Sequence, residues 1–401
     1  MLLQKKSLSL KLLLVVGGLL ILMSLSFILV SSISLNDAEK AIVSEVSSEV
    51  RAQIEQTVAA KSSAIAADIS SVFNENYVYP YKLANQIAAS IEGKLPEPYS
   101  RGQIEAMVKN SLSYSKVSSM YAQFDADKFD GNDANFTAGY THSVNGSGSL
   151  EVYFFREQDN KISQQIIDNA AEKHDETLDE FGNRAAHWYL CSKESLKPCI
   201  SNPYKYEIRP GYTELMTSLV VPVIANGEFR GVVGSDLNLP ILQAKAQQLK
   251  ASLYGGKASV LIVSHDGFLA AATEQEGSLA RPIKEALTSS AELLGISGQN
   301  KSIVVDDLLY VVRPIKINVA GNDWHLIVGI DIKAAMLPVA KISNDIAEII
   351  SQILISFLVL ALVSTILALT LVNFFTRSIV KPVKAVADKM AELAGQGGDL
   401  T

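Results

Sequence analysis

Two similar stretches of the sequence decide the fold. Residues 220–236 read VVPVIANGEFRGVVGSD, and residues 312–331 read VRPIKINVAGNDWHLIVGID. Each stretch is a β-type run with a proline, a turn rich in asparagine and glycine, and a second β-type run that ends in Gly-x-Asp. An internal repeat of this kind indicates two copies of one structural unit. We therefore expect two antiparallel sheets in series.

Further β-type runs precede and accompany these stretches. Turns separate the runs, which cover residues 117–124, 150–155, 215–223, 229–236, 260–263, 302–305, 309–317 and 324–331. In each half an early run enters a turn that contains aspartate, Phe124-Asp125 in the first half and His265-Asp266-Gly267 in the second. Strands mixed with short helices predict an α+β domain, with sheet modules at about 93–240 and about 255–335.

A helical pattern lies before the sheets. Its apolar residues recur mostly at intervals of four: Ile42, Val46, Val50, Ile54, Val58, Ile65, Ile69 and Val72. They share one face of a helix of about 35 residues, about 50 Å long. This stripe fits core packing, a coiled-coil dimer seam, or both. Pro80 is expected to kink or interrupt the helix, and Gly93 to Gly102 to form a loop.

Two long segments contain no charged residue, at 12–36 and 349–376, in a chain of 401 residues that is 48% hydrophobic. Each is long enough to cross hydrocarbon about 30 Å thick, which takes about 20 apolar residues. The first segment is longer than the apolar part of a signal peptide, and no clean cleavage site closes it. We expect an uncleaved anchor and a second transmembrane helix.

Charged residues orient these two segments. Basic residues lie outside the pair and acidic residues lie inside it: Lys5, Lys6, Lys11, Arg377, Lys381 and Lys384, against Asp37, Glu39, Asp345 and Glu348. The positive-inside rule then places both termini in the cytoplasm. We expect a cytoplasmic N-terminus at 1–11, transmembrane helices at 12–33 and 349–376, a periplasmic domain at 34–348 and a cytoplasmic segment at 377–401.

The only two cysteines, Cys191 and Cys199, lie in the external segment. In an oxidising compartment such a close pair forms a disulfide, which stabilises the fold by roughly 2.5 kcal/mol on the chain-entropy estimate. A metal site is the weaker interpretation, because two thiolates without a histidine at ligand spacing make half a zinc site.

No group of residues predicts catalysis, a cofactor or a metal. The five histidines are scattered, and Ser264-His265-Asp266 is a turn, because neighbours in sequence cannot form the relay geometry of a catalytic triad. No glycine-rich phosphate loop is present. The formal net charge of −7 gives no reason to expect a nucleic acid as partner. We expect a protein that is not an enzyme.

The segment 179–206 is the strongest candidate for a binding site. Acidic residues and a group of aromatic residues gather around the two cysteines. The aromatic residues are Phe181, His187, Trp188, Tyr189, Tyr204 and Tyr206. Aromatic rings attract a cation by roughly 0.5–2 kcal/mol each, and a buried carboxylate adds a charged hydrogen bond. The alternative interpretation is that the rings are core and the acids a solvated face.

Several features together resemble a known family. The long first helix, the two PAS-like sheet modules and the paired Gly-x-Asp strands are similar to the double Cache sensor domain of bacterial receptors. The stretch RSIVKPV at 377–383 and the ending GGDLT at 397–401 resemble the start of a HAMP relay domain, as in methyl-accepting chemotaxis proteins. The resemblance covers nearly the whole chain.

This resemblance implies a function. The chain would be a multi-pass chemoreceptor of the bacterial inner membrane, a homodimer that senses a small ligand in the periplasm. It would act through HAMP on a cytoplasmic kinase and coupling protein. The alternative is the sensor half of a histidine kinase or nucleotide cyclase.

The family's binding motif is partly matched. Amino-acid-sensing members carry Arg-x-Trp-Tyr, then Tyr-x-Asp, then the aspartate of the distal Gly-x-Asp strand. The arginine position is Ala186 here, with Arg184 two residues earlier, and the aspartate of Tyr-x-Asp falls on Tyr206. The pattern is closer to amine and polyamine receptors of the group. The resemblance implies that the membrane-distal module binds an amine or amino acid through Trp188, Tyr189, Tyr204, Tyr206 and Asp236. Asp331 is expected to support the strand-to-helix junction of the proximal module.

Overall fold

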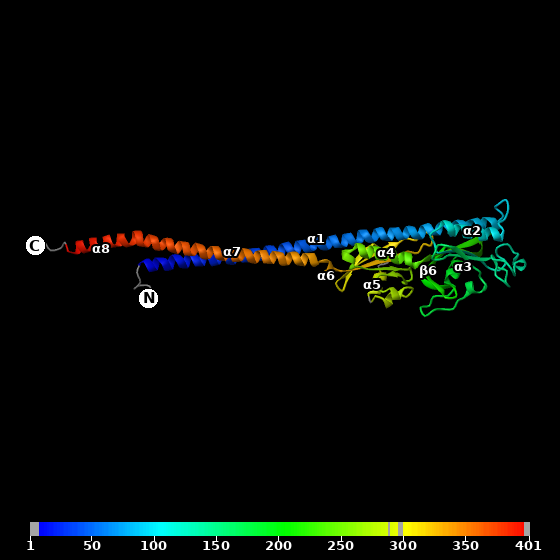
Figure 1. Ribbon diagram of the computed structural model, residues 1–401. Helices are drawn as coiled ribbons and strands as arrows, with labels where there is room; N and C mark the ends of the chain where they lie inside the picture. The colour runs from blue at the N-terminus through cyan, green and yellow to red at the C-terminus, as the bar shows by residue number, and fades with distance from the viewer. Residues whose placement is uncertain (1–7, 288, 296–299, 397–401) are drawn as a thin grey trace. The chain divides into compact units, whose positions relative to one another are not determined.

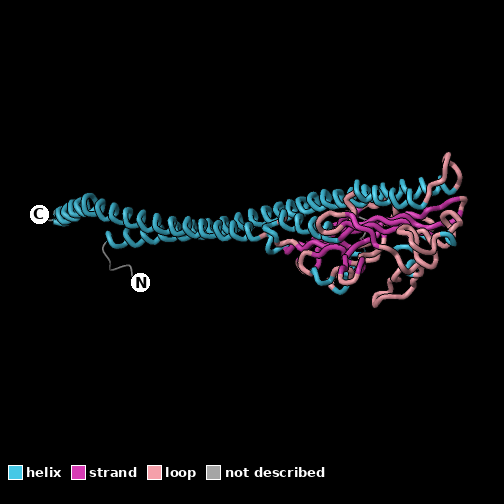
Figure 2. The backbone as a smooth tube through the Cα atoms, turned by 45° about the vertical axis from the view of Figure 1, so that its right-hand side comes forward, coloured by secondary structure: helices cyan, strands magenta, loops and turns pink. Residues whose placement is uncertain are grey.

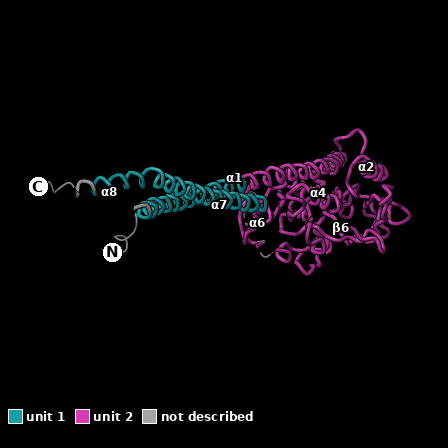
Figure 3. Tube along the Cα trace, turned by 60° about the vertical axis from the view of Figure 1, so that its left-hand side comes forward, with its two compact units in different colours: residues 1–52, 336–401 teal, residues 53–335 magenta. Residues whose placement is uncertain are grey.

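The computed structural model describes residues 8–287, 289–295 and 300–396. The chain divides into two compact units, residues 53–335 and the two terminal parts 1–52 and 336–401 (Figure 3). Lys5, Lys6 and the GGDLT ending at 397–401, which supported the predicted topology and the HAMP resemblance, lie outside the described residues.

Helix α1 (Leu8–Ile91) is continuous over 84 residues and contains Pro80. The prediction that Pro80 interrupts the helix is therefore wrong. A proline inside a helix costs about 3 kcal/mol through its missing N–H and its ring. Packing on both sides of Pro80 offsets that cost, because Phe73 and Tyr77 before it and Leu83 and Ile87 after it are buried.

The apolar stripe of α1 is core where it runs along the sheets. Ile54, Val58 and Ile69 are buried, whereas Ile42, in the terminal unit, is exposed. Phe73 meets Trp324 edge-on at 5.0 Å between ring centroids, and the Tyr77 hydroxyl donates to the Cys199 carbonyl oxygen at 2.5 Å. Both sheets lie along one side of this helix (Figure 1).

The first sheet is antiparallel and has seven strands. Its order is β3 (Ile162–Gln165), β2 (Glu151–Arg156), β1 (Ser119–Phe124), β7 (Glu228–Asn238), β6 (Tyr212–Ala225) and β4 (Cys199–Ile200), with β5 (Tyr204–Arg209) also paired to β6. Helices α2 (Arg101–Tyr114) and α3 (His187–Ser195) accompany it. Ser100 and Gln103 form a capping box that begins α2. We call residues 101–238 the first module.

The second sheet is also antiparallel, with five strands. Its order is β10 (Lys301–Val305), β11 (Leu308–Ile315), β12 (Trp324–Asp331), β8 (Ser259–Val263) and β9 (Leu269–Ala272). Helix α4 (Leu239–Ser252) leads into it, and α5 (Ser290–Gly295) lies between β9 and β10 in the chain. We call residues 259–331 the second module. Figure 2 shows the strands of both sheets.

The topology confirms the predicted repeat. In the first module the hairpin β6–β7 has β1 on the free side of β7, and in the second the hairpin β11–β12 has β8 on the free side of β12. Short 3-10 helices occupy the connections, at Asp133–Asn135, Glu172–His174, Tyr254–Gly256, Glu276–Ser278 and Ile283–Glu285. The α+β fold with two antiparallel sheets on one long helix is as predicted.

Among the residues that the structure describes, two helices are long and apolar enough to cross a membrane, Leu10–Ile91 and Leu337–Glu392. The second of these helices comprises α7 (Leu337–Phe375), a π-helical turn at Thr376–Val380 and most of α8 (Lys381–Gln396), after the short α6 (Ile332–Ala335). Within the terminal unit the rings of Phe27 and Phe357 lie 5.4 Å apart. Apolar side chains such as Leu22 and Leu360 are about two-thirds exposed, as expected for a surface that faces lipid.

Candidate ligand-binding site

Asp236 lies near the end of the central strand β7. Its neighbours in register are Ser119 on β1 and Ser218 on β6. Strands on both sides leave the side chain almost no access to water, and Asp236 is 1% exposed. Aspartate is rarely buried this deeply without a partner, so its surroundings are informative.

The Asp236 carboxylate is held by hydroxyl groups. Ser119 and Ser218 donate to it, the latter at 2.7 Å, and Tyr153 donates at 3.0 Å. Tyr204 lies 2.7 Å from the Ser218 hydroxyl oxygen and extends this network. Among the described residues no cationic side chain pairs with Asp236.

Burial raises the pKa of Asp236 to about 6, although the three hydroxyl hydrogen bonds act in the opposite direction and the Glu214 charge adds to the rise. At neutral pH the side chain is therefore largely ionised inside the fold, where an unpaired charge is unfavourable. A cation beside it would relieve this cost.

Aromatic rings surround this carboxylate. Tyr121 stacks on Tyr153 at 5.8 Å between centroids, and Trp188 meets Tyr121 edge-on at 5.4 Å. Tyr206 lies 6.1 Å from Tyr153. The rings enclose an inner chamber of about 20 Å³, which is lined by Tyr121, Gln123, Tyr153, Trp188, Tyr204, Tyr206 and Asp236. That volume suits one water molecule or one ammonium group.

The glycine of the first Gly-x-Asp strand makes room for one of these rings. Tyr121 and Gly234 are direct neighbours in register. A Cβ atom on Gly234 would lie 2.2 Å from the Tyr121 ring. The Tyr121 hydroxyl is buried and has no hydrogen-bond partner within the described residues. A buried orphan hydroxyl is costly, and here it borders the chamber.

A larger outer cavity of about 560 Å³ adjoins the chamber. The two share Trp188, Tyr204 and Tyr206. Four acidic residues line the outer cavity: Glu172, Asp175, Asp179 and Glu180. Asp179 accepts hydrogen bonds from the backbone N–H groups of Phe181 and Asn183, so it serves the local turn.

Glu172 is placed differently from the other acids of the outer cavity. It lies near Tyr206, and desolvation raises its pKa although the residue is exposed. Burial raises the pKa of Tyr206, and the charges of Glu172 and Asp236 raise it further. Tyr206 therefore lies near two carboxylates, Asp236 of the chamber and Glu172 of the outer cavity.

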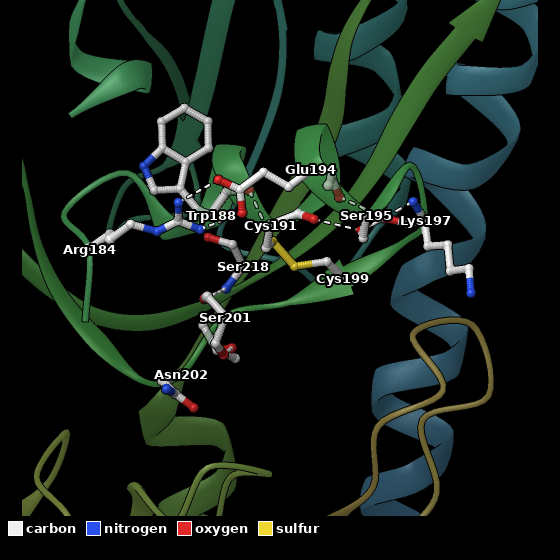
Figure 4. Close-up of a disulfide and its surroundings, with 12 residues drawn as sticks. Arg184, Trp188, Cys191, Glu194, Ser195, Lys197, Cys199, Ser201, Asn202 and Ser218 are labelled. Atoms are coloured by element: carbon white, nitrogen blue, oxygen red, sulfur yellow. Dashed lines mark hydrogen bonds and ion pairs between the residues drawn. A yellow bond between two sulfur atoms is a disulfide. The ribbon is translucent and has the colours of Figure 1, made fainter. Parts of the chain in front are cut away.

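Helix α3 carries Trp188 to the chamber, and a disulfide holds the helix. Cys191 on α3 is bonded to Cys199 on β4, as predicted (Figure 4). Arg184 forms two hydrogen bonds to Glu194, at 2.5 and 2.8 Å. Arg184 is therefore occupied within the first module, and the buried Ala186 stands at the arginine position of the family motif.

The statement that no histidine lies at ligand spacing from the cysteines is wrong. His187 precedes Cys191 by one helical turn, and the donor atoms of His187, Cys191 and Cys199 all lie within 4.8 Å of one another. Both sulfur atoms are joined in the disulfide and offer no thiolate. The expectation of no metal remains a prediction.

The structure brings Trp188, Tyr204, Tyr206 and Asp236 together around the inner chamber. Tyr189 lies elsewhere: it is fully buried, and its hydroxyl donates to Asp125 at 2.6 Å. Sequence reasoning missed the chamber residues Tyr121, Gln123 and Tyr153, the serines that hold Asp236, and Glu172. The period-two spacing of Ser119, Tyr121 and Gln123 on β1 was the available signal.

Asp331, the repeat counterpart of Asp236, has another environment. It is exposed at the end of β12, and it accepts a hydrogen bond from the Ala334 N–H at 3.1 Å. This contact caps the start of α6, the role at the strand-to-helix junction that the sequence predicted.

No family model matches the chain. The chain is 26% identical to the methyl-accepting chemotaxis protein TlpQ of Pseudomonas aeruginosa over 306 residues, which is 75% of this chain and 42% of TlpQ. The chain thus spans less than half the length of this relative. The sequence resemblance to methyl-accepting chemotaxis proteins is confirmed.

Solved structures show the same fold. The periplasmic sensory domain of the Campylobacter jejuni chemoreceptor Tlp1 matches with a TM-score of 0.57 at 15% identity, covering 72% of this chain and 99% of that domain. An extracellular domain assigned to a histidine kinase, mmHK1S-Z3, matches with a TM-score of 0.54 at 16% identity, covering 72% and 98%. The chain therefore has the fold of chemoreceptor sensor domains, which also serves a kinase sensor.

Proposed function

We propose that this chain is the sensor and membrane part of a chemoreceptor that binds a small amine in its first module. One observation carries the proposal. Asp236 is a buried carboxylate without a cationic partner among the described residues, and it faces a chamber walled by Trp188 and tyrosine rings. A protonated amine would supply the missing charge, contact the rings and give the Tyr121 hydroxyl a donor.

An amine fits better than an amino acid. Recognition of an α-carboxylate needs a free cationic donor. The two arginines that line the outer cavity are engaged, Arg184 with Glu194 and Arg281 with Glu180. Lys205 also lines this cavity, but it is exposed and alternates along β5 with the chamber residues Tyr204 and Tyr206.

Glu172 refines the ligand class. Its charge and that of Asp236 both act on Tyr206, but Glu172 lines the outer cavity whereas Asp236 lines the chamber. A linear diamine would place one ammonium group at Asp236, its methylene chain between Trp188 and the tyrosines, and its second ammonium group at Glu172. A cavity of this size belongs to the range typical of small-molecule sites.

A matched set of ligands tests the charge requirement. The full chain in detergent micelles is heated with 1,4-diaminobutane, 1-aminobutane, 1,4-butanediol or alanine. We expect the diamine to raise the melting temperature most, the monoamine less, and the diol and alanine not at all. A ligand at a hundred times its Kd stabilises the folded state by about 2.7 kcal/mol. Equal shifts from diol and diamine would contradict the proposal.

Glu172→Gln separates the two ends of the ligand. The substitution should lower the affinity for the diamine by about tenfold, because a charged hydrogen bond at a partly exposed position contributes about 1.5 kcal/mol. The monoamine should bind as it does to the parent. Equal loss for both amines would show that Glu172 supports the fold of the chamber and does not contact the second ammonium group.

We further propose that residues 34–348 are periplasmic, that the first module is farther from the membrane, and that the chain acts as a homodimer without enzymatic activity. The similarity to TlpQ supports this. Amine binding would repack the second module, shift α6 and the span in α7, and alter α8, the proposed start of a HAMP domain. The signal would then reach a cytoplasmic kinase and coupling protein.

The topology is open to a direct check. A reporter fused after Gly102 should be active only in the periplasm, and one fused after Lys384 only in the cytoplasm.

A histidine-kinase or cyclase output is the second candidate, since a kinase sensor has the same fold. Deletion of the gene should abolish accumulation of cells in a gradient of 1,4-diaminobutane. Unchanged accumulation with altered amine-dependent transcription would favour the kinase.

A further inference from the structure

Both modules bound the outer cavity. Most of its lining belongs to the first module, but Leu279, Ala280 and Arg281 of the second module complete it. We propose that this segment of the second module is the gate of the cavity and that Arg281 closes it. The proposal rests on the proposed amine site, because it assigns the control of entry to that site.

Arg281 links the two modules with one planar group. Its guanidinium donates to Glu180 at 3.0 Å and lies 5.4 Å from the centroid of the Phe181 ring, both in the first module. The other terminal nitrogen of the same guanidinium donates to Glu285 in the second module at 2.9 Å. A guanidinium can bind two carboxylates and cover a ring at the same time, which an ammonium group cannot do.

The backbone positions Arg281 at the mouth. Ala280 has a φ of +62°, in the left-handed region that residues with a Cβ rarely adopt. Two hydrogen bonds to β9 hold this turn, from the Ala280 N–H to the Leu269 carbonyl at 2.8 Å and from the Leu269 N–H to the Arg281 carbonyl at 2.9 Å. Strained backbone of this kind is frequent at ligand clamps.

A second contact between the modules, at Asn202, also borders the outer cavity and is more protected. Asn202 donates to Asp266 of the second module at 3.0 Å and to Asn183 at 3.1 Å, and it accepts from the buried Ser264 hydroxyl at 2.8 Å. It precedes Tyr204 of the chamber by two residues, and Figure 4 shows it next to Ser201, away from the disulfide.

The two contacts differ in how easily they break. The Arg281 and Glu180 side chains are 45% and 66% exposed, and exposed ion pairs are weak. Asn202 is only partly exposed, and Ser264 is buried. The mouth therefore opens at Arg281 while the modules stay joined at Asn202.

The gate gives the ligand a physical route to the second module. A ligand shifts an equilibrium only by its different affinity for the two states. With the cavity filled, the closed arrangement adds the contacts of Leu279 to Arg281 around the ligand. Amine binding then favours one position of the second module, from which β12 continues into α6.

Quenching of Trp188 fluorescence measures how often the gate is open, and it needs no ligand. The chain has two tryptophans; Trp324 is 1% exposed, whereas Trp188 lines both cavities. Acrylamide, a neutral quencher, should reach Trp188 more readily in Arg281→Ala than in the parent full chain. We expect the open population to rise about fivefold, with matching increases in the rates at which 1,4-diaminobutane enters and leaves.

A matched variant and a conservative one control the experiment. Arg209→Ala removes an arginine with the same kinds of contact, an ion pair to Glu157 and a ring contact with Tyr212, away from the mouth, and should match the parent. Arg281→Lys should restore part of the closure. Glu180→Gln removes the partner in the first module and should open the mouth even where Arg281→Ala folds poorly.

Unchanged quenching in both Arg281→Ala and Glu180→Gln would overturn the gate, and so would parental rates of amine entry and exit. A parent that binds no amine would instead overturn the proposed function. The quenching measurement would still decide the gate, because it needs no ligand.

Discussion

The two modules share a hairpin that ends in Gly-x-Asp, but they use the aspartate in opposite ways. Asp236 lies buried among hydroxyl groups and aromatic rings, and Asp331 lies exposed and caps a helix. The difference comes from the elements beside the hairpin. In the first module β1, β2 and α3 bring tyrosines and Trp188 over the strand. A repeated backbone motif therefore does not predict a repeated site.

The glycines of the two motifs should show the largest difference. In Gly234→Ala the new methyl group meets the Tyr121 ring, which the neighbouring strand holds in place. We expect a loss of about 3 kcal/mol in the free energy of unfolding and loss of amine binding. In Gly329→Ala the methyl group meets the Ser259 hydroxyl, which can rotate, and comes no closer than 3.0 Å to the Tyr310 ring. We therefore expect a smaller loss, of about 1 kcal/mol, and normal binding. Urea unfolding compares them, and equal losses would contradict this account.

Removal of the disulfide should affect the first module only. The pair Cys191→Ser and Cys199→Ser should lower the free energy of unfolding by about 2.5 kcal/mol, because the unfolded chain regains the freedom of the closed loop. Trp188 on α3 should become more mobile, as measured by fluorescence anisotropy. Mass spectrometry of unreduced parent peptides is the control. Free thiols on both cysteines there would refute the bridge.

Trp188→Ala should weaken amine binding by about tenfold, since one wall of the chamber contributes about 1–2 kcal/mol through its ring. Trp324→Phe, a change in the core of the second module, should leave the affinity unchanged. Calorimetric titration with 1,4-diaminobutane compares the two variants. A greater loss of affinity in Trp324→Phe would move the site toward the second module.

The pH dependence should distinguish the two aspartates. The pKa of Asp236 is raised to about 6, so the folded state holds a proton that the unfolded state releases at lower pH. Without ligand, the contribution of Asp236 to stability falls as pH rises from its unfolded pKa to about 6. Amine affinity moves the other way and should weaken by up to about tenfold per unit below pH 6, as the carboxylate protonates. Asp236→Asn should abolish both trends, and their persistence in that variant would assign them to another group.

The sequence predicts the fold well and the chamber poorly. The Gly-x-Asp strands β7 and β12 carry local signals, namely β-type runs and glycine turns. The short β4 has only two residues, and pairing with β6 defines it. Strand β5 does carry a local signal, because Tyr204, Tyr206 and Ile208 alternate with charged residues, but the sequence prediction did not include it. Tyr121 and Tyr153 reach Asp236 through pairings between β1, β2 and β7 that join distant parts of the chain. No local pattern encodes those pairings.

Paired titrations of Asp236→Asn and Asp331→Asn test the central claim most directly. Each folded variant is titrated with 1,4-diaminobutane by calorimetry, and its unliganded melting temperature must stay close to the parent's. Loss of a buried charged hydrogen bond of about 1.5–3 kcal/mol predicts an affinity about ten- to a hundredfold weaker for Asp236→Asn. Asp331→Asn should bind as the parent does. Loss of binding in Asp331→Asn with normal binding in Asp236→Asn would place the ligand in the second module and contradict the account.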